Sequence, residues 1–346
     1  SSGALAGSAN MTFSGTALTL ANDASISGLT VGKGGGSVGS NTAVGASALG
    51  GGSQTGVLNT VVGYQTGFTN TTASAISLFG YQAGYSNTTG DYLTAFGYKA
   101  AEKNTTGTNN TAIGVLSLNS NTTASANTAV GYQAGYTMTT NSGNTMVGYQ
   151  AGYLSTGGGD LFGYRAGYNN TGSGIAAFGT QALTANTSGS ANTAMGIQAL
   201  YNNTTASNNT AVGYQAGYSN TTGTTLTAFG FSAAYSNTTG ANNIAIGANS
   251  LNSNSTGNSN TVMGYQVAYY NTTGSYNTAI GDNALKSNTT ASNNTAVGYQ
   301  ALYDNTTGGT NTAIGQQAGQ HVTGGANTAV GQQALQSASG STANYN

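Results

Sequence analysis

The sequence predicts an all-β fold, a parallel β-solenoid (β-roll) of about 18 coils with about 17 residues in each coil. Three observations support this prediction. One glycine recurs from Gly45 to Gly331, and its spacing is 17 residues almost everywhere. A short apolar run precedes each of these glycines, and Gly, Asn and Ser cluster at turn-like positions between the runs. Pro is absent, as expected where nearly every backbone N–H takes part in a central ladder.

The composition narrows the classes of protein to which the chain can belong. Only 3% of its 346 residues are charged and the net charge is −1, whereas 37% are hydrophobic. Disordered chains combine low hydrophobicity with high net charge, so we expect a folded chain. Five Lys and Arg are too few for the basic surface that a nucleic acid requires, and no apolar run approaches the ~20 residues of a membrane span. We therefore expect neither a nucleic-acid partner nor membrane insertion.

The coil reads Asn-Thr-Ala-Val-Gly-Tyr-Gln-Ala-Gly-Tyr-Ser-Asn-Thr-Thr-Gly-Ser-Asn, and residues 209–220 preserve it nearly intact. Its composition predicts two short strands per coil, one over Asn-Thr-Ala-Val-Gly-Tyr and a second through Tyr-Ser-Asn-Thr-Thr. Parallel stacking in register places like residues over like, so that Asn and Gln amides bond to their copies. The Gln two positions after the glycine predicts such a ladder, at Gln65, Gln82, Gln133, Gln150, Gln198 and Gln215.

Two apolar columns precede the repeat glycine. The residue directly before it is bulky, as in Val44, Phe96 and Met195, and is predicted to fill the interior of the coil. The residue two before it is Ala in thirteen of the eighteen coils and apolar in the rest. A strand that is apolar on both faces is buried on both, so this Ala column is predicted to lie at the threefold axis of a homotrimer. The candidate interface residues are Ala112, Ala129, Ala211, Ala279 and Ala296.

The repeat divides the chain into three segments. Residues 1–40 lack the repeat but contain alternating pieces such as Met11-Thr12-Phe13, and they are predicted to lead into the first coil and cap it. Residues 41–336 are the predicted β-roll repeat domain. Residues 337–346 are predicted to be a flexible C-terminal tail.

The run Asn-Thr-Ala-Val-Gly, with Ala three residues after the glycine, resembles the N-S-V-A-I-G repeat in the heads of trimeric autotransporter adhesins. Together with the stretch from Leu18 to Gly36 and the Tyr-Gln-Ala-Gly-Tyr continuation, the pattern over 18–336 is more similar to marine phage tail-fibre repeats. The resemblance implies a left-handed roll and a homotrimer, although the adhesin repeat is shorter, near 14 residues. It also implies an extracellular place, in a virion tail fibre or a cell-surface filament, with a host surface receptor or polysaccharide as partner.

Residues suited to catalysis are few and scattered. The acids Asp23, Asp91, Glu102, Asp160, Asp282 and Asp304 fall in different columns of the repeat, so no two carboxylates are expected to stack as glycan hydrolysis requires. His321 is the one histidine, and we expect no Cys or acid near it to form a triad or a metal set, so it is predicted to be a solvated turn residue. We therefore predict that the protein is not an enzyme and has no catalytic, metal or cofactor site.

The Asn-Thr-Thr tripeptide recurs along the chain and has three interpretations. In the first interpretation the tripeptide forms a turn. In the second it is a glycan acceptor, since each copy is an Asn-x-Thr sequon. In the third it is a ligand face that binds ice or a polysaccharide. The candidate face comprises Asn87, Thr88, Thr89, Asn220, Thr221, Thr222, Asn305, Thr306 and Thr307. The Tyr columns likewise stack on sugars or pack as ladders along a sheet.

Taken together, the repeat and the missing catalytic groups predict a structural fibre or adhesin shaft, of a virus or a cell surface, that presents host-binding surfaces. The alternative is an ice-binding β-solenoid that uses its regular Thr and Asn rows.

Overall fold

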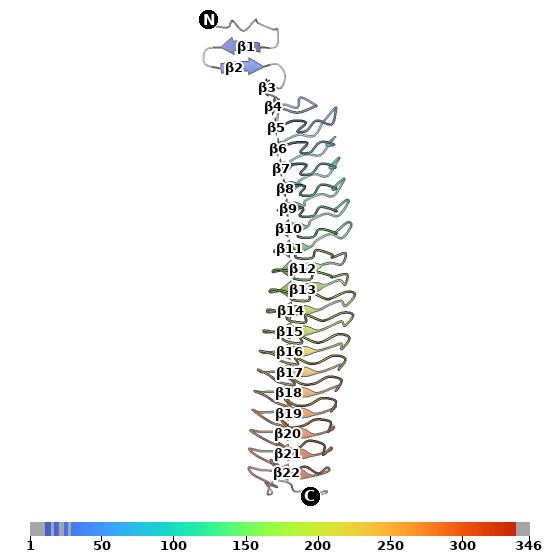
Figure 1. Cartoon of the computed structure of the whole chain (residues 1–346), viewed down its shortest axis with the longest axis vertical. Helices are drawn as coiled ribbons and strands as arrows, with labels where there is room; N and C mark the ends of the chain where they lie inside the picture. The colour runs from blue at the N-terminus through green and yellow to red at the C-terminus, as the bar shows by residue number, and fades with distance from the viewer. Residues whose placement is uncertain (1–10, 15–16, 21–23, 27–28, 337–346) are drawn as a thin grey trace. The chain divides into compact units, whose positions relative to one another are not determined.

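The computed structural model describes residues 11–14, 17–20, 24–26 and 29–336. These residues form strands and turns and contain no helix, and hence no helix of a length and hydropathy suited to crossing a membrane. The chain divides into two compact units, Ser1–Val147 and Gly148–Asn346. Within each unit the strands lie above one another, one per coil (Figure 1). The predicted tail, 337–346, lies outside the described residues.

The first unit begins with antiparallel strands. β1 (Met11–Ser14) pairs with β2 (Ala17–Leu20), and β3 (Ala24–Ile26) pairs with β4 (Leu29–Gly32). β4 then pairs antiparallel with β5 (Thr42–Val44), the strand of the first coil. β5 thus pairs with β4 along one edge and with β6 (Thr60–Val62) along the other.

From β5 onward the strands of each unit form a parallel ladder. The first unit continues with β6 (Thr60–Val62), β7 (Ser77–Phe79), β8 (Thr94–Phe96), β9 (Thr111–Ile113), β10 (Thr128–Val130) and β11 (Thr145–Val147). The second unit contains β12 (Gly159–Phe162), β13 (Ile175–Phe178), β14 (Thr193–Met195), β15 (Thr210–Val212), β16 (Thr227–Phe229), β17 (Ile244–Ile246), β18 (Thr261–Met263), β19 (Thr278–Ile280), β20 (Thr295–Val297), β21 (Thr312–Ile314) and β22 (Thr328–Val330). Like residues lie over like, as where Ala112 pairs with Ala129 and Ala279 with Ala296. The predicted parallel β-solenoid with coils of about 17 residues is confirmed.

Each coil contains one strand and not the two that were predicted. The Tyr-Ser-Asn-Thr-Thr segment forms turns, because its Asn folds the backbone back on itself: the N–H of Asn220 donates to the carbonyl of Gly217 at 3.0 Å. The segment still bonds to the next coil through alternate amides, since Ser219 N–H donates to Tyr235 O and Thr221 N–H donates to Thr238 O, both at 2.9 Å. Turns in register therefore extend the ladder around the coil.

The two apolar columns face opposite to the prediction. Ala112, Ala129, Ala211, Ala279 and Ala296 have no exposed surface within the single chain, so they lie inside the coil and cannot form the predicted trimer interface. The bulky residue directly before the glycine faces outward instead, and Met195 is 46% exposed. The reason is the narrow interior: a Cβ added at Gly217 would lie 2.9 Å from Leu200 Cδ2 and 3.1 Å from Leu226 Cδ2. Around Ala211 leucines fill this space and the strand carries a small side chain, whereas Leu78, Met146 and Leu161 occupy the same inward position in other coils.

The repeat glycine holds successive coils close together. At Gly213 the φ angle is +134°, and an added Cβ would lie 2.4 Å from the carbonyl oxygen of Gly230 in the next coil. A backbone oxygen at that distance excludes any side chain, and the φ value suits only glycine. The glycine therefore serves both the turn that follows the strand and the close approach of the next coil of the same chain.

Candidate functional site

The asparagines of the Asn-Thr-Thr tripeptides lie inside the coils. Asn87, Asn220 and Asn305 have no exposed surface. The Nδ2 of Asn220 donates to Asn203 Oδ1 at 3.0 Å and to Gly223 O at 2.9 Å, and its Oδ1 accepts from Asn237 Nδ2 at 2.8 Å. In the folded chain these amides are therefore available neither to a glycan nor to a ligand, and that part of the predicted face is wrong.

The two threonines of the tripeptide differ from each other. The first is partly buried in most coils, and its hydroxyl donates to the next coil, as from Thr88 to Thr105 O and from Thr221 to Thr238 O, both at 3.0 Å. The second threonine is exposed, at Thr89, Thr222 and Thr307, and Thr306 is exposed as well. Only the second position therefore provides a regular threonine column on the surface.

A second amide ladder runs through the Asn four positions before the repeat glycine. Asn260 donates its backbone N–H to Asn243 Oδ1 at 2.9 Å, and Asn277 Nδ2 donates to Asn260 Oδ1 at 3.1 Å. These side chains are buried as well. The sequence alone is sufficient to predict this ladder, because Asn recurs at that position and stacked amides satisfy one another's hydrogen bonds without charge.

Within each unit three columns make a continuous surface, here named the tyrosine–glutamine face: the side chains one, two and five positions after the repeat glycine. The predicted Gln ladder is confirmed where Gln82 donates to Gln65 and Gln215 donates to Gln198, both at 2.8 Å. Arg165, in the middle column, lies 5.5 Å from the ring centre of Tyr164 and 5.1 Å from that of Tyr168. The two outer columns are therefore neighbours across the middle one.

The tyrosines of this face stack on one another along each unit. The ring centres of Tyr64 and Tyr81 are 5.4 Å apart, and those of Tyr218 and Tyr235 are 5.1 Å apart, with nearly parallel planes. Burial, followed by the neighbouring Tyr235 and Tyr201, raises the pKa of Tyr218 above its ordinary value. Because each ring covers the face of the next, the edges and hydroxyls point to solvent. Within a run these columns are packing ladders, and a flat ring face is free only where a run stops.

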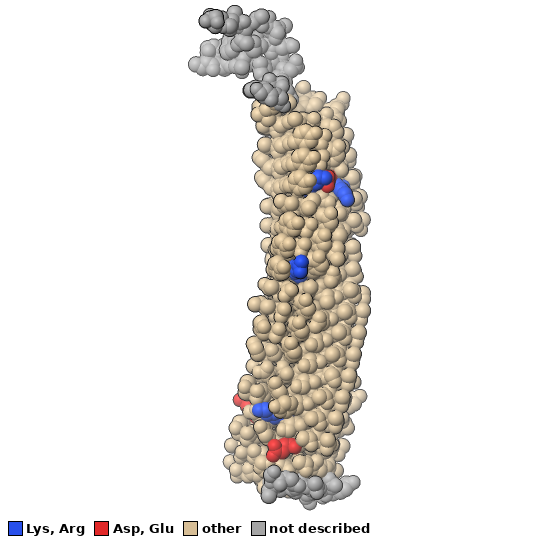
Figure 2. Space-filling view, viewed as in Figure 1, with Lys and Arg blue, Asp and Glu red and all other residues tan. Residues whose placement is uncertain are grey.

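Charged side chains are sparse on the visible surface (Figure 2). Lys99 Nζ lies 2.8 Å from Glu102 Oε1, and Asn119 Nδ2 donates to Glu102 Oε2 at 3.0 Å. Burial pushes the pKa of Glu102 upward, but the hydrogen bonds from Lys99 and Asn119 outweigh it and hold that pKa below its ordinary value. Any partner of this surface must consequently recognise amides, hydroxyls and apolar groups.

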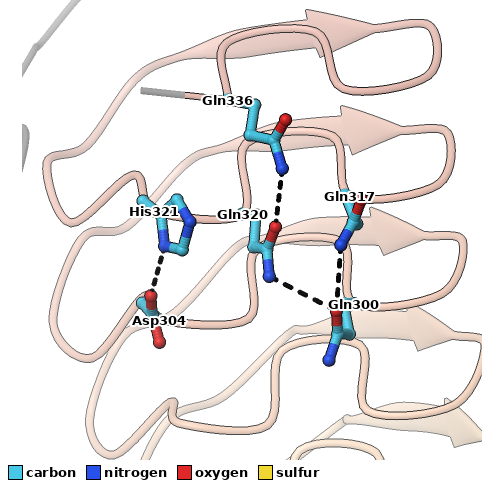
Figure 3. A network of polar contacts seen from close by, with 6 residues as sticks. All are labelled: Gln300, Asp304, Gln317, Gln320, His321 and Gln336. Atoms are coloured by element: carbon cyan, nitrogen blue, oxygen red, sulfur yellow. Dashed lines mark hydrogen bonds and ion pairs between the residues drawn. The ribbon is translucent and has the colours of Figure 1, made fainter. Parts of the chain in front are cut away.

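His321 has an acidic neighbour, contrary to the sequence-based prediction. Its Nδ1 lies 2.5 Å from Asp304 Oδ2 in the preceding coil (Figure 3). The two residues are one repeat apart, and that spacing was the signal the prediction missed. Among the described residues, no group of three His, Cys, Asp or Glu lies close enough together to hold a metal ion. The pair therefore joins two coils.

An amide network accompanies this pair. Gln300 Oε1 accepts from Gln317 Nε2 at 3.2 Å and from Gln320 Nε2 at 3.3 Å, and Gln336 Nε2 donates to Gln320 Oε1 at 2.9 Å (Figure 3). The Gln ladder of the middle column thus branches into the outer column of the tyrosine–glutamine face near the end of the described chain.

The exposed surfaces of the described residues include three with regular columns: the bulky apolar residues directly before the repeat glycine, here named the apolar outer column, the tyrosine–glutamine face, and the exposed threonine column. The first is uncharged and apolar, the second combines ring edges with amides, and the third offers one hydroxyl and one methyl per coil. Comparison of the chain with models of protein families, with curated proteins and with solved structures gave no match in any of the three.

Proposed function

We propose that this chain is a structural segment of an extracellular fibre, a virion tail fibre or a cell-surface filament, that assembles as a left-handed homotrimer and presents host-binding surfaces. The observation that carries the proposal is the apolar outer column. A fibre segment needs a contact that recurs along its length, and a β-solenoid with one such residue per coil supplies it.

The apolar outer column is too regular to be scattered surface exposure. In the second unit its members include Phe178, Met195, Phe229, Met263, Ile280 and Ile314, each between 37% and 46% exposed. Soluble monomers rarely expose continuous apolar patches larger than a few hundred Å². Since the Ala column is inside the coil, the outer column replaces it as the contact through which we place the copies of the chain.

We expect the parent chain to have a solution mass of about 102 kDa, three times its chain mass of 34.0 kDa. The combined variant Met195→Asp, Val212→Asp and Phe229→Asp is expected to remain folded, because these side chains face outward, but to fall toward the monomer mass. A trimer of this variant would bring nine carboxylates together at the contact, and their repulsion opposes assembly. Light scattering measures the mass, and circular dichroism measures the retained β-structure.

A matched control carries the same charge on another surface. Thr205→Asp, Thr222→Asp and Thr239→Asp lie on the exposed threonine column of adjacent coils and are expected to leave the trimer intact. A monomeric parent, or equal loss of mass in both variants, would show that the apolar outer column is not the contact.

Ice binding is the second candidate, and the exposed threonine column favours it. Thr205, Thr222 and Thr239 are exposed at the same position of successive coils, which repeat at the strand spacing of about 4.8 Å. Against it, the first threonine of most tripeptides uses its hydroxyl within the stack, which leaves a single row. The fibre proposal predicts no thermal hysteresis. Hysteresis that disappears when these three threonines are replaced by Lys would assign the function to ice binding instead.

A further inference from the structure

Both aromatic columns of the tyrosine–glutamine face are interrupted in the same coil, which begins at Gly247. The column one position after the glycine reads Tyr214, Phe231, Ala248, Tyr265 over four consecutive coils, and the column five positions after it reads Tyr218, Tyr235, Asn252, Tyr269. A small or polar residue thus stands where each ladder would carry a ring. The interruption leaves four aromatic side chains around one coil that has none on this face.

The distance across the interruption suits one additional ring. Tyr214 and Phe231 stack with ring centres 5.3 Å apart, so two such steps place the rings of Phe231 and Tyr265 about 11 Å apart. Offset stacking operates at ring-centre distances of about 4.5–7 Å. A ring above Ala248 would therefore stack on both neighbours at the spacing that the ladder already uses.

The two flanking rings have a face each without a partner. Among the described residues Phe231 stacks on Tyr214 alone, and no ring contact exists for Tyr265. Phe231 is 54% exposed, which is the highest value among the aromatic residues of its column, and Tyr265 is 48% exposed. Both flanking rings are therefore accessible to solvent.

The polar side chains that this coil places on the tyrosine–glutamine face, Asn249 and Asn252, are both amides. Asn249 takes the place of the ladder Gln, and in the described part of the chain its side chain has no hydrogen bond. Asn252 donates Nδ2 to Ser232 O at 3.1 Å, which leaves its Oδ1 to accept. The coil from Gly247 to Met263 contains no charged residue. At this coil a ligand meets the ring faces of the flanking coils and the coil's own amides but no charge within the coil, which favours an uncharged ligand with hydrogen-bonding groups at the edge of a ring.

We propose that this coil binds one pyranose ring of a neutral glycan. The sugar ring lies above Ala248 with its C–H faces on Phe231 and Tyr265, and its hydroxyls bond to the amides of Asn249 and Asn252. A purely aromatic group would leave both amides without partners, which favours the sugar. In the proposed fibre this site is one of the host-binding surfaces, so its biological role rests on the proposed function. Sugar binding itself does not rest on it.

The test is glycan binding by the purified full chain, measured by calorimetry and saturation-transfer NMR with cellohexaose, maltohexaose and mannohexaose as probes. We expect at least one of them to bind with a Kd near 1 mM, which corresponds to about 4 kcal/mol. Ala248→Tyr completes the ladder with the ring found in other coils, so it is expected to lower affinity at least roughly tenfold while the β circular dichroism stays unchanged. Asn249→Gly keeps the backbone relaxed at φ +56° and should weaken binding by removing the amide.

The matched control is Thr180→Tyr, which fills an interruption of the same column in another coil and should leave affinity unchanged. Absence of binding for all three probes, or affinity unaffected by Ala248→Tyr, would overturn the site. Phenol that binds to the parent where the sugars do not would also overturn it, in favour of an aromatic ligand. The mass from light scattering is read in parallel, so failure of the trimer and failure of the sugar site are separate outcomes.

Discussion

Ala211→Glu is expected to disrupt the coil that contains it and to lower its stability by more than about 4 kcal/mol, among the largest effects of a single substitution. Ala211 lies on β15 with no exposed surface, and its Cβ would be 3.8 Å from a Cβ built at Gly217. A carboxylate at this position would be buried without a partner in a space already filled. Hydrogen exchange of the peptides that cover 205–235, together with thermal unfolding followed by circular dichroism, measures the loss.

The neighbouring outward position provides the control. Val212→Asp adds the same charge on the other face of β15, where the side chain reaches solvent, so the coil should keep its hydrogen-exchange protection. If Ala211→Glu folded normally and lost only its assembly, the Ala column would lie at a chain contact after all. The burial of that column within one chain leads us to expect the reverse.

Gly213→Ala is expected to lower the stability of the fold by about 3–5 kcal/mol, the second large effect. Backbone strain and a steric clash with the next coil both contribute. The φ angle of +134° is accessible only to glycine, and the new methyl would lie 2.4 Å from the Gly230 carbonyl oxygen. That oxygen belongs to the backbone of the next coil, so relief requires the two coils to separate. We expect a lower melting temperature and faster hydrogen exchange on both sides of the substitution.

Two other glycines distinguish the cost of backbone strain from the cost of the clash between coils. Gly331 has the same place in the repeat and a φ of +118°, but nothing lies within 4 Å of its Cβ position, so Gly331→Ala should cost only the backbone strain of about 1–3 kcal/mol. Gly39 has neither positive φ nor a close neighbour, and Gly39→Ala should be neutral or slightly stabilising. Equal effects at Gly213 and Gly331 would mean that the contact between coils contributes nothing.

The repeat made much of the fold predictable, because a residue separation of one period translates into contact between coils. The Gln ladder at Gln65 and Gln82 follows from that rule, and so does the pair of Asp304 and His321, for which the period was not applied. The faces of the strand could not be assigned in the same way. Alternation indicates that Ala211 and Val212 point in opposite directions, but the choice of the inner one depends on the width of the coil.

The candidate surfaces were less predictable than the fold. Sequons such as the one at Asn220 read as exposed turns, yet the amide is held inside by its copies in the adjacent coils. The interruption at Ala248 is visible in the sequence, but its meaning depends on the ring spacing, which only the structure provides. Composition therefore predicts which residue types are abundant, and stacking decides which of them reach a partner.

The buried Asn ladder also has a direction, with a consequence for biosynthesis. Where the amides of adjacent coils bond, Nδ2 donates to the Oδ1 of the preceding coil, as Asn104 donates to Asn87 and Asn121 to Asn104, so the newest coil presents acceptors toward the C-terminus. A chain that emerges from the ribosome N-terminus first can add coils one at a time, closing loops of only 17 residues. At Asn121 and Asn305 the next coil has Met138 and Val322 in place of the donor, and the Oδ1 of each is buried without a hydrogen bond. At Asn288 the next coil does carry an asparagine, but Asn305 Nδ2 donates to Gly308 O, so Asn288 Oδ1 is buried without a partner as well. New coils at these places are added without the hydrogen bond of the ladder.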